Sequence, residues 1–128
     1  MKKTLFFCCI ALLLAALFLP VGAAAVNVRD NADLLSEGEE ASLQALLSAS
    51  DANGVSLYLY TMQSSGPDDY PSNGAVLNAC GITRDTSSVI LVVRETRIAY
   101  YYDMYLFGAA DRMFSNADVD RILDDPDV

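Results

Sequence analysis

The side chains of this chain that could do chemistry are mostly carboxylates. The 128 residues include 17 Asp and Glu, 8 Lys and Arg, and no His. The absence of His excludes Ser–His–Asp and Cys–His catalysis and His-ligated zinc. Cys8 and Cys9 lie in an N-terminal apolar run, which leaves Cys80 alone in the rest of the chain. We expect Cys80 to be a buried free thiol that packs as a small apolar side chain.

The charge balance narrows the classes of partner. The formal net charge is −9 at pH 7, and the two lysines, Lys2 and Lys3, both lie at the N-terminus. A surface this acidic repels nucleic acid and anionic lipid head groups. It can instead attract a hard divalent cation such as Ca²⁺ or Mg²⁺. We therefore expect no nucleic-acid partner.

Two local patterns have a functional and a structural interpretation. Asp118 and Asp120 resemble the start of an EF-hand loop, but they fall within a predicted helix and lack the central Gly, so we interpret the match as chance. The run from Tyr100 to Tyr102 alternates between two faces of a strand. It is typical either of packing under a helix or of an amphipathic patch for a partner or membrane, and we favour packing.

The N-terminus has the layout of a secretory signal. Lys2 and Lys3 precede an apolar run from Leu5 to Leu19, and Ala23–Ala25 offers a cleavage site of small residues. The alternative is an uncleaved anchor helix, which needs ~20 apolar residues. We predict a signal peptide over residues 1–25 and an exported, extracytoplasmic product, secreted or held at the outer face of the cell membrane.

Helices follow from caps and apolar stripes in residues 26–128. Ser36 and Glu39 form a capping box, which opens a helix predicted over residues 37–52. A weaker helix is expected over residues 75–80, and Ser115 to Asp118 looks like the cap of another. Pro126 would end that last helix.

Strands follow from alternation and from apolar runs. Residues 55–61 alternate leucine with tyrosine, which predicts a strand with one face in the core. Residues 89–93 are apolar on both faces and indicate a central strand that is covered on both sides. The 26 or so residues between these strands suit a crossover to a parallel neighbour. Residues 94–97 are expected to turn the chain into a hairpin partner at 98–102, which gives a mixed sheet with helices packed on it.

Four segments in this order resemble the TPM domain family, also described as photosystem II repair-protein-like or TPM phosphatase. They are residues 28–36 (VRDNADLLS), the acidic-headed helix and the strand at 54–61, residues 85–93 (DTSSVILVV), and the strand after Arg97. The resemblance covers residues 26–128. It implies a three-layer α/β/α sandwich, a mixed β-sheet with helices on both faces, on the outer side of a membrane. The final helix and any C-terminal span or tail are missing, so the resemblance also implies a truncated domain.

The resemblance further implies a metal site at Asp30, Asp85 and Asn116. Some members bind Ca²⁺ or a similar cation in acidic loops at one end of the sheet, and acid phosphatase activity is claimed for plant members. Asn116 stands where the family has an acid, so one charge is lost, and the turn from Asp85 to Ser88 departs from the family's pattern. Helix capping alone would also account for Asp30 and Asn116.

Three hypotheses for function remain open from the sequence. The first is a binding or assembly module with an envelope or membrane-protein partner, to which a divalent cation could bind. The second is a metal-dependent acid phosphatase, in which a cation at Asp30 and Asp85 would polarise a phosphoryl oxygen. The third is a truncated, inactive fragment.

Overall fold

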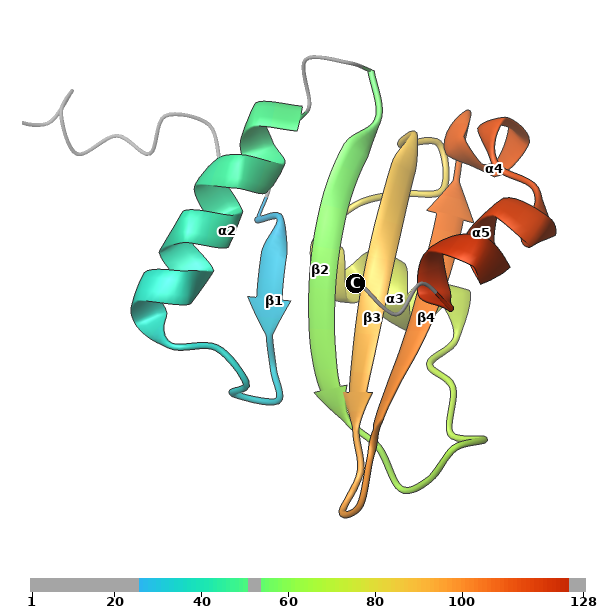
Figure 1. Cartoon of the computed structure of the whole chain (residues 1–128). Coiled ribbons are helices and arrows are strands. Elements are labelled where there is room, and N and C mark those ends of the chain that lie inside the picture. The colour runs from blue at the N-terminus through green and yellow to red at the C-terminus, as the bar shows by residue number, and fades with distance from the viewer. Residues whose placement is uncertain (1–25, 51–53, 125–128) are drawn as a thin grey trace, which may run out of the picture.

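The structure, a computed structural model, describes residues 26–50 and 54–124 as an α/β fold with a mixed sheet (Figure 1). The expected fold class is confirmed. The elements in chain order are β1 (Val28–Asp30), α2 (Glu37–Ala49), β2 (Ser56–Gln63), α3 (Asn73–Cys80), β3 (Ser88–Glu95), β4 (Tyr100–Phe107), α4 (Ala110–Met113) and α5 (Asn116–Leu123). The predicted end of the first helix and Pro126 lie outside the described residues.

The sheet has the order β1-β2-β3-β4. β2 and β3 run parallel, as the crossover length predicts, and β4 pairs with β3 as an antiparallel hairpin. β1 is a parallel edge strand beside β2. Three residues are too few to show alternation, so the sequence did not indicate β1. The predicted turn at 94–97 was placed too early, because β3 continues to Glu95.

One face of the sheet, here called the closed face, carries the core. Tyr58, Ile90, Val92 and Phe107 lie on it and pack against Val76, Leu77 and Cys80 of α3. Ile90, Val92 and Val76 have no exposed surface. Cys80 is a buried free thiol, as expected, and its burial raises the pKa to about 11. The closed face is therefore the side of β2 that bears tyrosines, not the side that bears leucines.

The opposite face, here called the open face, is only partly covered. It carries Leu57, Leu59, Val89, Leu91, Tyr102 and Met104, which line a groove together with residues of α2 and α5. Neither α2 nor α5 contains a buried residue. Along β3, buried and half-buried residues alternate, so this strand is fully covered on one side and only partly covered on the other. The expected third layer is thus incomplete over the described residues.

Polar contacts help to hold α2 on the sheet. The Gln44 side chain accepts hydrogen bonds from the N–H groups of Asn27 and Val28, at 2.8 and 3.1 Å, and its amide donates to Asn27 Oδ1 at 3.0 Å. The Asn27 side chain in turn donates to the carbonyl of Leu57 at 2.8 Å. Asn27 is fully buried. Buried amides that are fully paired fix a geometry well, so this contact holds α2 beside β1 and β2.

Local signals set the helix ends and one tight turn. Capping boxes are present at Ser36 with Glu39 and at Ser115 with Asp118, both at the predicted positions. Gly108 has a φ of 63°, and a Cβ there would lie 2.9 Å from the backbone of Ser87. Only glycine fits that approach, so the end of β4 and the start of β3 stay close together. Within the described residues, no helix has the length and apolar character needed to cross a membrane.

Candidate functional site

Asp30 lies at the carboxyl end of β1 and organises the turn into α2. Its carboxylate accepts hydrogen bonds from the N–H groups of Leu34 and Leu35, at 3.0 and 2.7 Å, and from the hydroxyl of Thr61 at 2.5 Å. Burial alone would raise the pKa of Asp30. The hydrogen bonds from Thr61, Leu34 and Leu35 outweigh it and hold the pKa below its ordinary value. Both carboxylate oxygens are engaged within the fold.

The other two residues expected in the metal site lie elsewhere. Asp30 pairs with Thr61 of β2, and Thr61 in turn pairs with Val93 of β3. Asp85 is exposed in the turn before Ser88, at the opposite end of β3. Val93 and Ser88 are five residues apart along the strand, which is about 16 Å. The structure therefore does not bring Asp30 and Asp85 into one pocket.

Asn116 is the exposed first residue of α5, and the hydroxyl of Ser115 caps that helix. Asp118, from the motif interpreted as chance, completes the cap by accepting from the N–H of Ser115 at 2.9 Å. Among the described residues, no group of three or more Cys, Asp or Glu is placed to hold a metal ion. Binding of Ca²⁺ or Mg²⁺ by this chain stays a prediction.

The most concentrated polar cluster centres on Arg94, which the sequence did not single out. Arg94 is 1% exposed, and its Nε donates to Asp103 Oδ2 at 2.6 Å. Its Nη1 reaches the carbonyls of Gly66, Pro67 and Asp69 at 3.1 to 3.2 Å. The guanidinium also lies 4.2 Å from the ring centre of Tyr70. Arg94 thus fixes the loop after β2 to the closed face.

Strand alternation could have located this cluster. Arg94 has the same parity as Ile90 and Val92, which places its side chain on the closed face. A buried arginine needs an acceptor, and Asp103 lies opposite Val92 on the adjacent strand. Without the pairing register, however, the sequence offers no reason to choose Asp103 over another acid.

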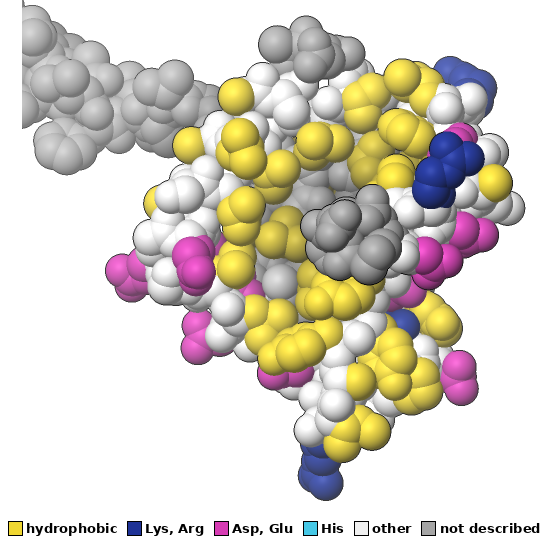
Figure 2. All heavy atoms as spheres, viewed as in Figure 1, with side chains coloured by type: hydrophobic (Ala, Val, Ile, Leu, Met, Phe, Trp, Pro, Cys, Tyr) yellow, Lys and Arg dark blue, Asp and Glu magenta, His cyan; other side chains and the backbone are white. Residues whose placement is uncertain are grey.

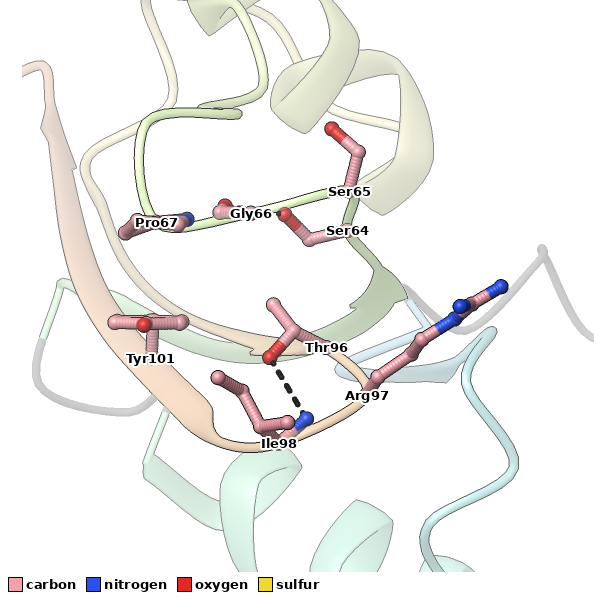
Figure 3. Close-up of a pocket in the computed structure, with 8 residues that line it drawn as sticks. All are labelled: Ser64, Ser65, Gly66, Pro67, Thr96, Arg97, Ile98 and Tyr101. Carbon is pink, nitrogen blue, oxygen red and sulfur yellow. Dashed lines mark hydrogen bonds between the residues drawn. The ribbon is translucent and has the colours of Figure 1, made fainter.

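The loop that Arg94 holds forms one wall of a pocket of about 540 Å³ at the carboxyl ends of β2 and β3. Figure 3 shows it between the loop from Ser64 to Pro67 and the hairpin from Thr96 to Ile98, with Tyr101 at one side. This is a common position for ligands in α/β sheets.

The serine and threonine hydroxyls that line this pocket are engaged in holding the loop and the hairpin. Ser64 Oγ donates to the carbonyl of Gly66 at 2.9 Å, and Ser65 Oγ donates to Asp69 at 3.0 Å. Thr96 Oγ1 donates to the carbonyl of Ala99 at 2.9 Å, and Ile98 N–H approaches Thr96 Oγ1 at 3.4 Å. These contacts indicate a structural role more than a catalytic one, because general acid–base work needs a group poised to exchange a proton with substrate.

Comparison with known protein families gives one match, to the TPM domain, over residues 28–126. The chain belongs to the TPM domain family. No curated protein and no solved structure matches the chain. The resemblance seen in the sequence is therefore confirmed at the level of the family.

The groove on the open face is the most prominent apolar feature of this TPM domain. It has a volume of about 430 Å³. Leu43 and Leu47 of α2 form one wall and Ile122 and Leu123 of α5 the other, with strands β2, β3 and β4 as the floor. Figure 2 shows apolar side chains gathered across this face, with acidic side chains to either side.

Among the described residues, several apolar side chains at the margins of the groove are exposed. Leu57 of the floor is 36% exposed, Tyr102 is 54% exposed and Ile122 of the wall is 40% exposed. Contiguous apolar surface of this kind marks interaction sites in soluble domains. The arrangement can bind apolar groups, and it offers no nucleophile or base to act on them.

Proposed function

We propose that this TPM domain is an exported binding module that acts at the outer face of the membrane and docks an apolar helix of an envelope partner in the groove. The incomplete cover of the open face is the observation that carries the proposal. Its floor and walls supply apolar surface whose burial is favourable by about 25 cal/mol per Å². The sequence of residues 1–25 supports the location.

The floor of the groove favours a helix over an extended peptide. β2 and β3 are inner strands, each paired with a neighbour on both sides. Their backbone groups are used in the sheet, so a segment lying on this face has to satisfy its own backbone hydrogen bonds. An α-helix does so. A segment that added to the edge of β4 would form a strand there and would leave the groove open.

The chemistry of the chain also favours binding over catalysis. The sequence has no His to act as base, and the carboxylate oxygens of Asp30 are occupied by Thr61, Leu34 and Leu35. A phosphatase with a cation between Asp30 and Asp85 would require two ends of the sheet to meet. No observation favours that second function, so we do not propose it.

The proposal is tested with a synthetic amphipathic helix that has an apolar stripe and uncharged glutamine flanks. The protein is taken as an exporting bacterial host delivers it, and fluorescence anisotropy of the labelled peptide measures binding. We expect binding that Leu57→Asp abolishes and that Ile98→Asp leaves unchanged. Ile98 is 92% exposed at the hairpin tip, so it is a matched apolar-to-acidic control outside the groove.

Two results would contradict the binding-module proposal. One is equal binding of this peptide to the protein and to the Leu57→Asp variant. The other is turnover of p-nitrophenyl phosphate, with Ca²⁺, Mg²⁺ or Mn²⁺, that disappears in Asp85→Ala. The export part is checked separately by sequencing the N-terminus of the extracytoplasmic product, where we expect Val26 as the first residue.

A further inference from the structure

We infer that the helix recognised by the groove carries lysine or arginine along its flanks, collected toward the end of the groove where β2 and β3 finish. This inference rests on the proposed function. It adds the charge of the partner helix and the end of the groove at which that charge lies. It follows from the charges on the two helices that form the walls.

The walls of the groove are both acidic. α2 contains Glu37, Glu39 and Glu40 and no basic residue, and α5 contains Asp118 and Asp120 against the single Arg121. Figure 2 shows acidic side chains on both sides of the apolar face. Glu37 and Glu40 line a neighbouring hollow with Val26 and Val28, so their charge acts through space, across α2, on a helix seated between α2 and α5. Basic flanks are complementary to this field, and acidic flanks are repelled.

The width of the floor suits one helix. The distance from β2 to β4 is two strand spacings, about 10 Å, and an α-helix with its side chains is about 10–12 Å across. The cavity of about 430 Å³ is smaller than a whole helix, so it holds the side chains of one stripe. Residues at i, i+3 or i+4, and i+7 form such a stripe.

The acidic groups are not spread evenly along the groove. All three glutamates of α2 lie in its first turn, which follows the carboxyl end of β1. Glu95, the last residue of β3, has the parity of Leu91 on the open face and accepts a hydrogen bond from Gln63 at 2.5 Å. These four carboxylates lie toward the end where the parallel strands finish, against Arg97 of the hairpin, so the basic residues of the partner belong at that end.

The same charges argue against a second copy of this chain as the occupant. Two open faces brought together would oppose acidic walls to acidic walls, and like charges placed opposite each other are destabilising. The partner is thus a different, basic segment.

The test compares three peptides of equal length: the stripe with lysine flanks, the stripe with glutamine flanks, and the lysine peptide with its apolar residues scattered. At low salt we expect the lysine-flanked stripe to bind about tenfold more tightly than the glutamine-flanked one, since several exposed ion pairs contribute about 0.2–1 kcal/mol each. The advantage should shrink as salt is added, and the scattered peptide should not bind.

Variants then locate the charge. Two double variants each remove two negative charges. Binding of the lysine-flanked peptide should be weakened more by Glu37→Gln/Glu40→Gln than by Asp120→Asn/Asp124→Asn. All four side chains are outside the capping boxes, which use Glu39 and Asp118. Leu57→Asp and Ile122→Asp, one in the floor and one in a wall, should each abolish binding. Circular dichroism before and after titration shows which variants are folded.

The outcomes separate this inference from the function on which it rests. Equal affinity for lysine and glutamine flanks overturns the inference and leaves the binding module intact, whereas binding of neither stripe peptide overturns both. If the lysine peptide with scattered apolar residues binds as tightly as the lysine-flanked stripe, the attraction is non-specific and the inference is overturned. A dimer that Leu57→Asp dissociates, or a lipid found in the groove by native mass spectrometry, identifies another occupant and overturns it as well.

Discussion

The two faces of the sheet differ in how completely they are buried, although the same strands form both. On the closed face, Ile90 and Val92 have no exposed surface, and Arg94 fastens the loop after β2 to the same face. On the open face, Leu91 and Val89 stay half-buried and the helices on either side bury no residue of their own. The difference separates the part of the molecule that holds the fold from the part available to a partner.

The largest expected contrast comes from two adjacent residues of β3. Ile90→Ala leaves a cavity in a closed core and should reduce the free energy of unfolding by about 4 kcal/mol. Leu91→Ala removes a side chain that is already partly solvated, so we expect a loss of about 1 kcal/mol. Urea denaturation of both variants measures the difference. Equal losses would show that the open face is as well packed as the closed one.

The next largest effect concerns the buried ion pair. Asp103→Ala leaves the Arg94 guanidinium without its carboxylate, and removal of one partner of a buried pair costs 3–5 kcal/mol, so we expect about 3 kcal/mol here. The lower value reflects the 20% exposure of the Asp103 side chain. Asp111→Ala, an exposed aspartate of α4, is the matched control and should change stability little. A loss below about 1 kcal/mol for Asp103→Ala would mean that the pair behaves as a surface salt bridge.

A smaller effect is expected at the helices of the open face. Ser36→Ala removes the hydroxyl that accepts from the N–H of Glu39, and loss of an N-cap costs about 1 kcal/mol. Because α2 lies beside the groove, the variant should also weaken binding of the lysine-flanked peptide. Ser72→Ala makes the same change at the cap of α3, on the closed face. It should lower stability to a similar degree without changing the affinity for the peptide. A lower affinity in Ser72→Ala would show that the two faces are not independent.

Much of the fold was open to prediction because its signals are local. The capping boxes at Ser36 and Ser115 and the left-handed stop at Gly81 need only a few neighbouring residues. Alternation and the crossover length then give the parallel pair β2 and β3. The three-residue β1 has too little pattern to be recognised, and its place depends on Asn27 and Gln44, which are 17 residues apart.

The candidate site was less open to prediction because it depends on register and on burial. Nothing local distinguishes the leucine side of β2 from its tyrosine side, since both are apolar enough to be buried. Tyr58 is buried because α3 packs on its side, where Val76 and Leu77 meet it. Asp30 was noticed as an acid at an element edge, but its partner Thr61 lies 31 residues away. The resemblance implied a metal ligand at Asp30, and the hydrogen bonds of the structure show a carboxylate that organises a turn.

The smallest expected effect is a dependence on pH that arises at Asp30, in the turn that leads into α2. The pKa of Asp30 is lower in the folded chain than its ordinary value, so its charged form stabilises the fold. That contribution is complete above the unfolded pKa, about 3.9, and is lost as the pH falls through the lower folded pKa. Asp30→Asn should be less stable than the natural chain at neutral pH, and the gap should close below about pH 4.

Thermal unfolding of both chains across a series of pH values measures that gap. Asp85→Asn is the control, because Asp85 is exposed in its turn, and its curve should run parallel to that of the natural chain. A gap for Asp30→Asn that stays constant on acidification would show that Asp30 acts through shape and not through charge. If the gap closes while affinity for the lysine-flanked peptide falls with it, the turn at Asp30 also sets how α2 stands at the groove. The open face would then depend on a carboxylate at its edge strand, whose partner Thr61 has the parity of Leu57 and Leu59 but does not line the groove.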